Sequence, residues 1–339
     1  MDTNTLRFKH SSFLDDIMRS AQLAAALEVS GWPKPGNVHR TADYVNMTFE
    51  QFIAGSIALG PANREAAFKG ILAGMGKIKI EDIGIGQYIK KSVIDFKAWH
   101  LNGNTHLGTS LLFLPLSASA GYTFAQREEI DPVSLRKNVI RIMEATTTLD
   151  AIDVYEAIKY ADPAGLGQLK SVDAPDLTEK GVKKEILDTG QTLFDLMKVS
   201  SQWDTISQEW VTGMKISFKI GYSTIKRVYN ETRNINITTV NTFLTLLAQF
   251  PDTFIARKVG VKVIQDIPRA VAIGLKKAEE ISKKAAEIIR LGGLKTAKGK
   301  KALLTFDKEL RLDHKLNPGT TADLTAASLL IAILCGLRP

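Results

Sequence analysis

The segment SFLDDIMRSAQLAA, residues 12–25, repeats an apolar side chain every three or four positions, which is the period of one helix face. Ser12 and Asp15 predict a capping pair at the start of this run. The pattern ends at 31–36, where Gly and Pro predict a loop. The face consists of Phe13, Leu14, Ile17, Met18, Ala21, Ala24 and Ala25. The segment therefore predicts a helix that leads into a Pro/Gly loop.

Helix signals recur along the rest of the chain. Thr48 with Gln51 predicts a capping box for a helix that ends near Gly60, and Asp131 before Pro132 predicts another helix start. Further helices are expected at about 150–160, 181–188, 191–200, 205–219, 238–250, 302–314 and 321–337, with one or two long helices ending at 290. Only KIKIEDIGI, residues 77–85, alternates like a strand, which is too little for a sheet. The prediction is an all-α fold: a single, bundle-like domain of many helices over residues 1–339, with functional loops at helix ends.

Composition excludes several classes of protein. The chain has 339 residues, of which 45% are apolar and 24% charged, as in ordinary globular proteins. Its only cysteine, Cys335, excludes an intramolecular disulfide and predicts a reducing, cytoplasmic setting. The N-terminus lacks the pattern of a signal peptide. The longest apolar run, 326–337, is well short of the ~20 residues that span a bilayer, so we expect a buried core helix and no membrane partner.

Positive charge is concentrated between Arg257 and Lys301. This stretch has 13 Lys and Arg against four Asp and Glu, whereas the whole chain has a net charge of +8. Such a stretch is typical of a solvated helix face, and it could also bind polyphosphate or nucleic acid. No aromatic residues lie between these lysines, which weakens a nucleic-acid surface. We therefore expect no nucleic-acid partner.

Three loops carry residue types that suit phosphate binding. In EVSGWPKPGNVHR, residues 28–40, two prolines hold Lys34 in an extended backbone and Gly36 permits close approach of another group, although a simple turn would also fit. In NGNTHLGT, residues 102–109, Asn, Thr and Gly precede an apolar helix, whose N-terminus favours anions, and His106 could move a proton or simply be hydrogen-bonded in place. In LNPGTTADL, residues 316–324, Asp323 lies near a helix start, where the helix dipole is expected to lower its pKa.

Taken together, EVSGWPKPGNVHR, NGNTHLG and LNPGTTADLTAASLL resemble the signature loops of the triphosphoribosyl-dephospho-CoA synthase family, in the same order. DAIDVYEAI, DPAGLGQL, SSQWDTISQEW and LAQFPDTFIARKVG are similar to its archaeal, functionally uncharacterised branch. Two positions depart from the family pattern. His39 stands where the family loop has an acid, and Leu107 stands where it has a lysine.

The resemblance implies a transferase whose substrates are ATP and 3′-dephospho-CoA or a related acceptor. A ribose hydroxyl of the acceptor attacks C1′ of the ATP ribose, adenine leaves, and the triphosphate stays on the product. Such a reaction needs a base, and Mg²⁺ with cations to hold the triphosphate. The resemblance implies catalytic roles for Glu28, Asp323 and His106, and metal ligation by Glu28, Asp204 and Asp323. It implies substrate binding by Lys34, Gly36, Asn37, Asn104, Thr105, Gly108 and Lys258.

Lower-ranked candidates are Glu209, Asp252 and Arg257, each of which could instead cap or line a helix. Four tryptophans could stack a base, although core packing is expected for at least three of them. Two alternatives remain. The chain could be a nucleotide- or phosphate-binding protein that keeps the pocket without turnover, or it could transfer a related phosphoribosyl group in another cofactor pathway.

Overall fold

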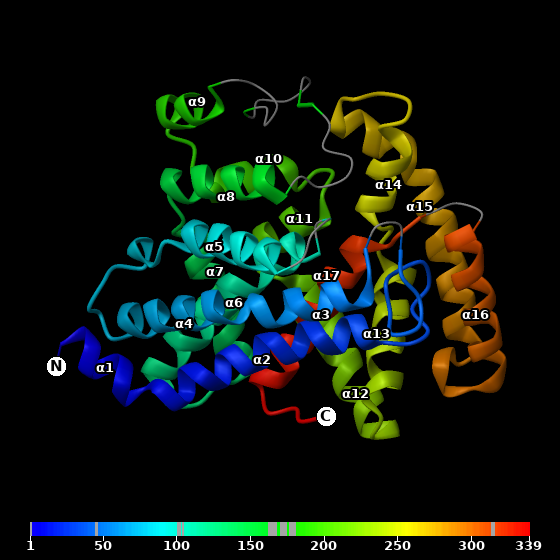
Figure 1. Ribbon diagram of the computed structural model, residues 1–339, viewed down its shortest axis with the longest axis horizontal. Helices are drawn as coiled ribbons and strands as arrows, with labels where there is room; N and C mark the ends of the chain where they lie inside the picture. The colour runs from blue at the N-terminus through cyan, green and yellow to red at the C-terminus, as the bar shows by residue number, and fades with distance from the viewer. Residues whose placement is uncertain are drawn as a thin grey trace.

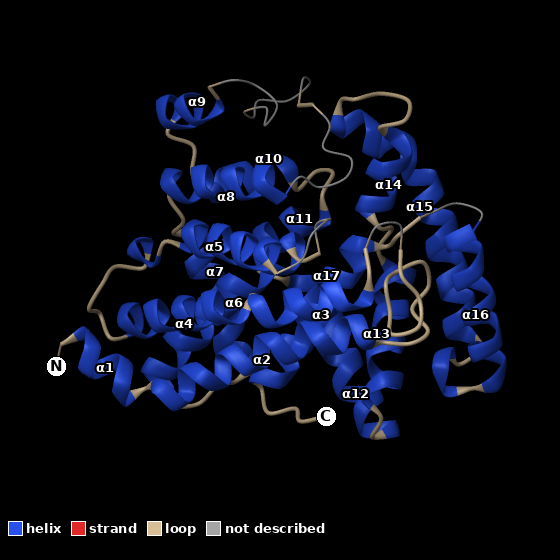
Figure 2. Cartoon of the chain, viewed as in Figure 1, coloured by secondary structure: helices blue, strands red, loops and turns tan. Residues whose placement is uncertain are grey.

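The computed structural model describes residues 2–44, 47–99, 103, 105–161, 168–169, 175, 181–312 and 316–339. Across these residues the chain is helical, and its extended pairs are only isolated bridges such as His39 with Ala42 (Figures 1 and 2). The all-α prediction is therefore confirmed. The prediction of one domain over the whole chain stays a prediction.

The helices follow one another with short connections over most of the described chain. In the N-terminal half they are α1 Thr3–Lys9, α2 Ser11–Ser30, α3 Phe49–Ala58, α4 Gly60–Gly74, a 3-10 turn Glu81–Ile83, α5 Ile85–Ala98, α6 Leu107–Arg127, α7 Pro132–Glu144 and α8 Thr148–Ala161. In the C-terminal half they are α9 Val182–Thr189, α10 Leu193–Ser200, α11 Thr205–Thr212, a π-helical segment Ser217–Tyr222, α12 Ser223–Thr232, α13 Ile235–Gln249, α14 Thr253–Gly260, α15 Ile267–Arg290, a 3-10 turn Gly293–Lys295, α16 Ala297–Leu312 and α17 Gly319–Leu334.

Helices α6 and α17 are buried along most of their length and organise the core. Helix α6 lies directly against α4, because a Cβ added at Gly121 would meet the Ala67 carbonyl oxygen at 1.9 Å and one at Gly70 would meet that of Ala118 at the same distance. Helix α17 contacts α2, α6 and α13. The expected core helix at 326–337 is buried from Ala326 to Ile333, and α17 ends at Leu334.

A second apolar cluster joins α13, α14, α15 and α16. In Figure 1 the long helices α15 and α16 form one edge of the molecule, beside α13 and α14. Helix α15 buries one stripe and turns most of its lysines to solvent, as an amphipathic surface helix does. The basic stretch 257–301 is thus mainly a solvated helix face. Arg257 on α14 is an exception, as described below.

Local end signals predicted some helix boundaries and missed others. Thr48 and Gln51 form the capping box of α3, and Asp131 caps α7. The pair Ser12 and Asp15 does not cap α2, which begins at Ser11 directly after α1 and has His10 at its N-cap.

Two predicted elements are wrong for physical reasons. Residues 77–85 form a bend, the 3-10 segment and the first residue of α5 instead of a strand, since no neighbouring strand offers hydrogen bonds in the described chain. The helix expected over 205–219 ends at Thr212 because Gly213 adopts a left-handed backbone, with φ of +62°. The helix expected over 302–314 begins earlier, at Ala297, and its end at 314 lies outside the described residues.

Within the described residues, none of the helices combines the length and the apolar character needed to cross a bilayer.

Candidate functional site

A cavity of about 280 Å³ lies where the ends of several helices meet. All three loops singled out in the sequence contribute to its wall, although they are far apart along the chain. The lining includes Glu28 and Asn37 from the first loop, Thr105, His106 and Gly108 from the second, and Asn317 and Asp323 from the third. Asp204 of α11 and Arg257 of α14 also line it. Lys34, Gly36 and Lys258 are not lining residues, and Asn104 lies outside the described residues.

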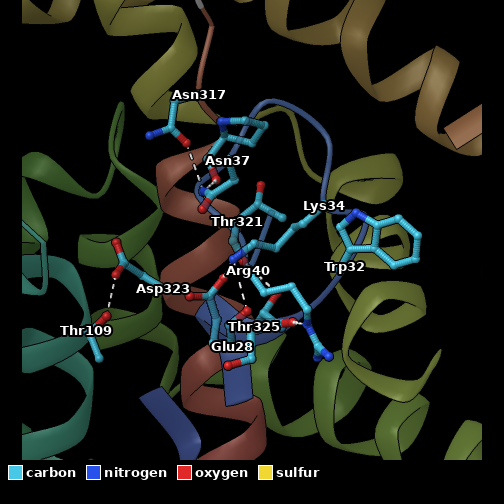
Figure 3. A network of polar contacts seen from close by, with 12 residues as sticks. Glu28, Trp32, Lys34, Asn37, Arg40, Thr109, Asn317, Thr321, Asp323 and Thr325 are labelled. Carbon is cyan, nitrogen blue, oxygen red and sulfur yellow. Dashed lines mark hydrogen bonds and ion pairs between the residues drawn. The ribbon is translucent and has the colours of Figure 1, made fainter. Parts of the chain in front are cut away.

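Glu28, which lines the cavity, forms a buried ion pair with Lys34, which does not. The Lys34 ammonium donates to the Glu28 carboxylate and, at 3.0 Å, to the Glu28 carbonyl oxygen (Figure 3). Burial raises the pKa of Glu28 and lowers the pKa of Lys34, and each charge partly offsets that effect on the other. Lys34 is fully buried and its cation holds Glu28, so phosphate binding by Lys34 stays a prediction.

Asp323 is a buried carboxylate in the cavity wall. The Thr109 hydroxyl donates to it at 2.6 Å, and Gly108 makes room for it, since a Cβ there would lie 2.1 Å from Asp323 Oδ2 (Figure 3). The pKa of Asp323 is raised to about 8: burial raises it most, the charges of Glu28 and Asp252 also raise it, and the hydrogen bonds from Thr109 lower it. The expected lowering by the helix dipole is wrong, because desolvation outweighs it.

Asp252 supports the third loop from outside the cavity. Its carboxylate accepts from the backbone N–H of Ile255 at 3.0 Å, which caps α14. It also accepts from the Thr321 N–H at 2.8 Å and the Thr321 hydroxyl at 2.7 Å. Burial raises the pKa of this carboxyl. Asp252 therefore fixes the start of α17, and with it Asp323, relative to α14.

The first loop is braced by two residues of α16 that sequence reasoning missed. Asp307 accepts from the Gly36 N–H at 2.8 Å and lies 3.3 Å from the His39 ring. Arg311 donates to Asp307 at 2.8 Å and to the carbonyl oxygens of Asn37 and Asp43. The available signal was an Asp and an Arg four residues apart on a helix whose other cations are lysines.

Gly36 allows the first loop to adopt the backbone conformation that these contacts with α16 require. Its φ is +70°, and a Cβ would lie 2.5 Å from the Leu316 carbonyl oxygen. The close approach expected at this glycine is therefore made by the third loop, to which Asn37 also donates, at 2.8 Å to Asn317 Oδ1 (Figure 3). Gly36 joins two loops instead of contacting the cavity.

His106 lies in the cavity wall with both ring nitrogens facing protein hydroxyl groups. Its Nδ1 is 2.8 Å from the Thr105 hydroxyl and its Nε2 is 3.4 Å from the Ser56 hydroxyl. The rings of Phe52 and Phe96 pack beside it at centroid distances of 5.4 and 5.9 Å. The catalytic role of His106 stays a prediction, and this packing favours a role in orienting Thr105.

The two adjacent cations of α14 have different environments. Lys258 donates to the Tyr44 hydroxyl at 3.1 Å and packs over its ring, away from the cavity lining. Arg257 lines the cavity, and its Nε atom is buried without a hydrogen-bond partner. Burial lowers the pKa of Arg257, whereas the charges of Asp204 and Asp252 raise it.

The candidate metal ligands do not gather into one cluster. Among the described residues no group of three or more His, Cys, Asp or Glu side chains is placed to hold a metal ion, so Glu28, Asp204 and Asp323 form no such group. Asp204 caps α11 by accepting from the Ser207 N–H at 2.9 Å. Glu28 and Asp323 interact electrostatically at the cavity and are the remaining pair of oxygen donors.

One part of the cavity wall is apolar. It is contributed mainly by α8, α10 and α15, two of which, α8 and α10, pack against each other. Its residues include Val154, Ile158, Leu193, Leu196, Met197, Ile267 and Val271, with Trp203 nearby in the lining. The expectation that at least three tryptophans pack in the core is wrong: Trp210 is buried, Trp203 lines the cavity, and Trp99 is 73% exposed.

Comparison with known proteins agrees with the loops that form the cavity. A model of the ATP:dephospho-CoA triphosphoribosyl transferase family matches residues 14–338. A solved structure described as "Crystal structure of putative triphosphoribosyl-dephospho-coA synthase from Archaeoglobus fulgidus" is 25% identical, with a TM-score of 0.59 over 86% of this chain and 100% of that chain. No curated protein matches the chain.

The family match covers all three loops and the helices that position them. The resemblance drawn from the loop sequences is thereby confirmed, and the enzyme is a transferase. The chain belongs to the ATP:dephospho-CoA triphosphoribosyl transferase family, whose reaction moves a triphosphoribosyl group from ATP to dephospho-CoA.

Proposed function

We propose that the cavity is the catalytic site, in which Asp323 accepts the proton of the acceptor's ribose hydroxyl. The observation that carries this proposal is the position of Asp323 in the wall where all three loops meet, with a pKa raised to about 8. A carboxylate that binds protons this tightly is a stronger base than an exposed one once it is ionised. Perturbed carboxylates of this kind cluster at active sites.

The transfer balances with one base and one leaving group. The hydroxyl oxygen forms a bond to C1′ of the ATP ribose while the bond from C1′ to the adenine nitrogen breaks. Asp323 takes the hydroxyl proton, and adenine leaves with the electron pair of the broken bond and takes up one proton from water. Asp323 then returns its proton to water, so the numbers of protons match on the two sides. The triphosphate remains attached to the transferred ribose during the whole reaction. The site therefore needs positive charge to hold the triphosphate, in addition to the base.

The pair of carboxylates fits a magnesium ion that arrives with the triphosphate. Mg²⁺ is commonly held by one or two carboxylates together with substrate phosphates. Glu28 and Asp323 would supply these oxygens, and the mutual repulsion that raises the pKa of Asp323 would be relieved by a cation. When bound, the ion would neutralise the triphosphate. Lys34 contributes by favouring the ionised form of Glu28 and by orienting it.

The apolar wall from α8 and α10 suits the pantetheine arm of dephospho-CoA. That arm is a long, weakly polar chain, and Leu193, Leu196 and Met197 offer it apolar surface. Thr105, Gly108 and Asn37 lie in the polar part of the lining, where hydroxyl, backbone and amide groups can orient the ribose and phosphates. A cytoplasmic location remains a proposal that rests on the single cysteine.

The test is detection of free adenine and of an acceptor product after incubation with ATP, Mg²⁺ and dephospho-CoA. We expect adenine and product in equal amounts from the wild type, and a loss of at least ~10²-fold for Asp323→Asn, which keeps the shape but cannot take the proton. Thr325→Val is the matched control, because it removes a buried hydroxyl on the same helix that bonds only to the Thr321 carbonyl oxygen. Equal rates for Asp323→Asn and wild type would exclude Asp323 as the base.

A binding protein without turnover is the second candidate. Leu107, which replaces the family's lysine, lines the cavity and leaves that position without a cation. If the wild type binds ATP but forms neither adenine nor product over hours, this second candidate is the correct function.

A further inference from the structure

The cavity contains one permanent cation among its described lining residues, and that cation is Arg257. The other basic side chains near the loops are committed elsewhere. Lys34 is buried against Glu28, and Lys258 bonds to Tyr44 outside the lining. A triphosphate or diphosphate carries several negative charges and requires donors and positive charge where it binds.

Arg257 has the free hydrogen-bonding capacity that such a ligand needs. Its Nε atom is buried without a partner, and no ion pair within 4 Å involves its guanidinium in the described chain. A buried guanidinium donor left unsatisfied costs free energy, and a ligand oxygen that accepts from it would recover that cost. The ring of Phe254, 5.3 Å from the guanidinium carbon, packs beside the group without occupying its donors.

The nearby carboxylates do not use up this charge. Asp204 accepts from the backbone N–H and the hydroxyl of Ser207. Asp252 accepts from Thr321 and from the backbone N–H of Ile255. Both act on Arg257 only through their longer-range charge. They therefore help to keep the guanidinium charged while leaving its donors available.

We propose that Arg257 is the phosphate anchor of the cavity, binding a phosphate group of ATP or of the acceptor through its guanidinium donors. The choice of ligand rests on the proposed function; the anchoring role rests on the position and unsatisfied donor of Arg257. At this site Arg257 supplies the positive charge that Leu107 cannot supply in the second loop. ATP and dephospho-CoA both carry a phosphate anhydride, so separate titrations with each are needed to show which of the two Arg257 binds.

The experiment measures calorimetric binding of three probes, each with Mg²⁺: inorganic triphosphate, ATP and dephospho-CoA. Arg257→Gln is expected to weaken at least one of them by about 10- to 100-fold, the loss typical for hydrogen bonds to a charged group. A loss for triphosphate and ATP assigns the anchor to the donor nucleotide, and a loss for dephospho-CoA alone assigns it to the acceptor. Arg257→Lys should retain part of the affinity, because it keeps the charge and loses the planar fork.

Arg269→Gln is the matched control, since it removes a cation that is 68% exposed on the adjoining helix α15. It should bind all three probes as the wild type does. The ligand-free thermal midpoint of Arg257→Gln should be close to that of the wild type, because no hydrogen bond or ion pair within the described chain is lost. A lowered midpoint together with unchanged probe affinities would show a structural role and overturn the anchor.

The proposed anchor is overturned if Arg257→Gln binds all three probes with the affinity of the wild type. It is also overturned if the wild type binds none of them. Failure of the proposed function looks different. In that case the wild type binds inorganic triphosphate through Arg257 and releases no adenine. If instead adenine release is normal in both proteins, the proposed reaction stands and the anchor is wrong.

Discussion

Hydrogen bonds from Thr109 lower the pKa of Asp323 and so oppose the larger effect of burial. The Thr109 hydroxyl donates to the carboxylate at 2.6 Å and favours its ionised form; with this bond in place the pKa is about 8. A base works in its deprotonated form, so kcat/KM should rise with pH until Asp323 is ionised in the free enzyme. A residue of the second loop thus influences the titration of a residue of the third loop, although the two lie far apart in sequence.

Thr109→Val is predicted to shift this rise in kcat/KM to higher pH. Without the hydroxyl the carboxylate loses a donor that favours its charged form, so its pKa increases further. The measurement is a pH profile of adenine release at limiting ATP between pH 6 and 10. Thr325→Val should leave the midpoint unchanged; an unshifted Thr109→Val profile would separate Asp323 from the observed titration.

The raised pKa of Asp323 also predicts how the free energy of unfolding changes with pH. Below about pH 4 the carboxyl is protonated in both the folded and unfolded states. Between about pH 4 and 8 the unfolded state has lost this proton while the folded state keeps it, so stability decreases as pH rises. Asp323→Asn should therefore gain stability relative to wild type by about 1 kcal/mol for each pH unit between 5 and 8.

The check is urea unfolding of both ligand-free proteins at pH 5, 6.5 and 8. The difference between the two free energies of unfolding should grow across this series and level off above pH 8. A difference that is constant with pH would show that Asp323 titrates normally in the folded protein.

At the residue scale, the sequence could identify which types of side chain matter but not how they are paired. Glu28, Asn37, Thr105 and Asp323 were candidates, and all of them reach the cavity. The burial of Lys34 could not be predicted, because its partner Glu28 lies at the end of a helix whose final direction depends on tertiary packing. Their roles in catalysis and binding stay predictions.

At the scale of elements, α16 holds the first loop against α17. Arg311 donates to two loop carbonyl oxygens and to Asp307, which in turn binds the Gly36 N–H. This brace was missed because residues 307 and 311 are about 270 positions away from the loop in sequence, and the helix carrying them looked like a generic basic surface. The acid that the family loop usually carries is absent at His39, and Asp307 is the carboxylate that faces this histidine.

Arg311→Met is predicted to destabilise the fold by about 2 kcal/mol, because it leaves Asp307 and two loop carbonyl oxygens without their donor in a largely buried site. The loosened loop should also raise the KM for ATP. Urea unfolding and initial rates measure the two effects. Lys308→Met, on the exposed face of the same helix, is the control and should change neither. A full-stability Arg311→Met protein with normal KM would contradict the bracing role.

The apolar wall formed by helices α8 and α10 leads to a prediction about which acceptor the enzyme prefers. Dephospho-CoA is adenosine diphosphate joined to pantetheine, so ADP tests the same ribose without the arm. We expect dephospho-CoA to be preferred over ADP as acceptor, and Met197→Gln to reduce that preference about tenfold by placing an amide in the apolar wall. Leu149→Gln, 68% exposed on α8, should not alter the ratio of kcat/KM values. Equal use of ADP and dephospho-CoA by the wild type would contradict an arm site.

Across the whole molecule, apolar periodicity and end signals predicted the all-α class, since each helix pattern is local. The close packing of α4 on α6 and the division of the core between two apolar clusters depend on contacts between distant helices, which periodicity does not encode. The three loops could be joined in one site from sequence only through the family resemblance. In the folded chain their convergence follows from the buried positions of α6 and α17 between the other helices.

The most direct test is a crystal structure of the protein with ATP and Mg²⁺ in the absence of an acceptor. The account predicts nucleotide density in the cavity, with the triphosphate between the carboxylates Glu28 and Asp323 on one side and the Arg257 guanidinium on the other. Density for the nucleotide at another surface, with the cavity holding only solvent at saturating ATP, would contradict it.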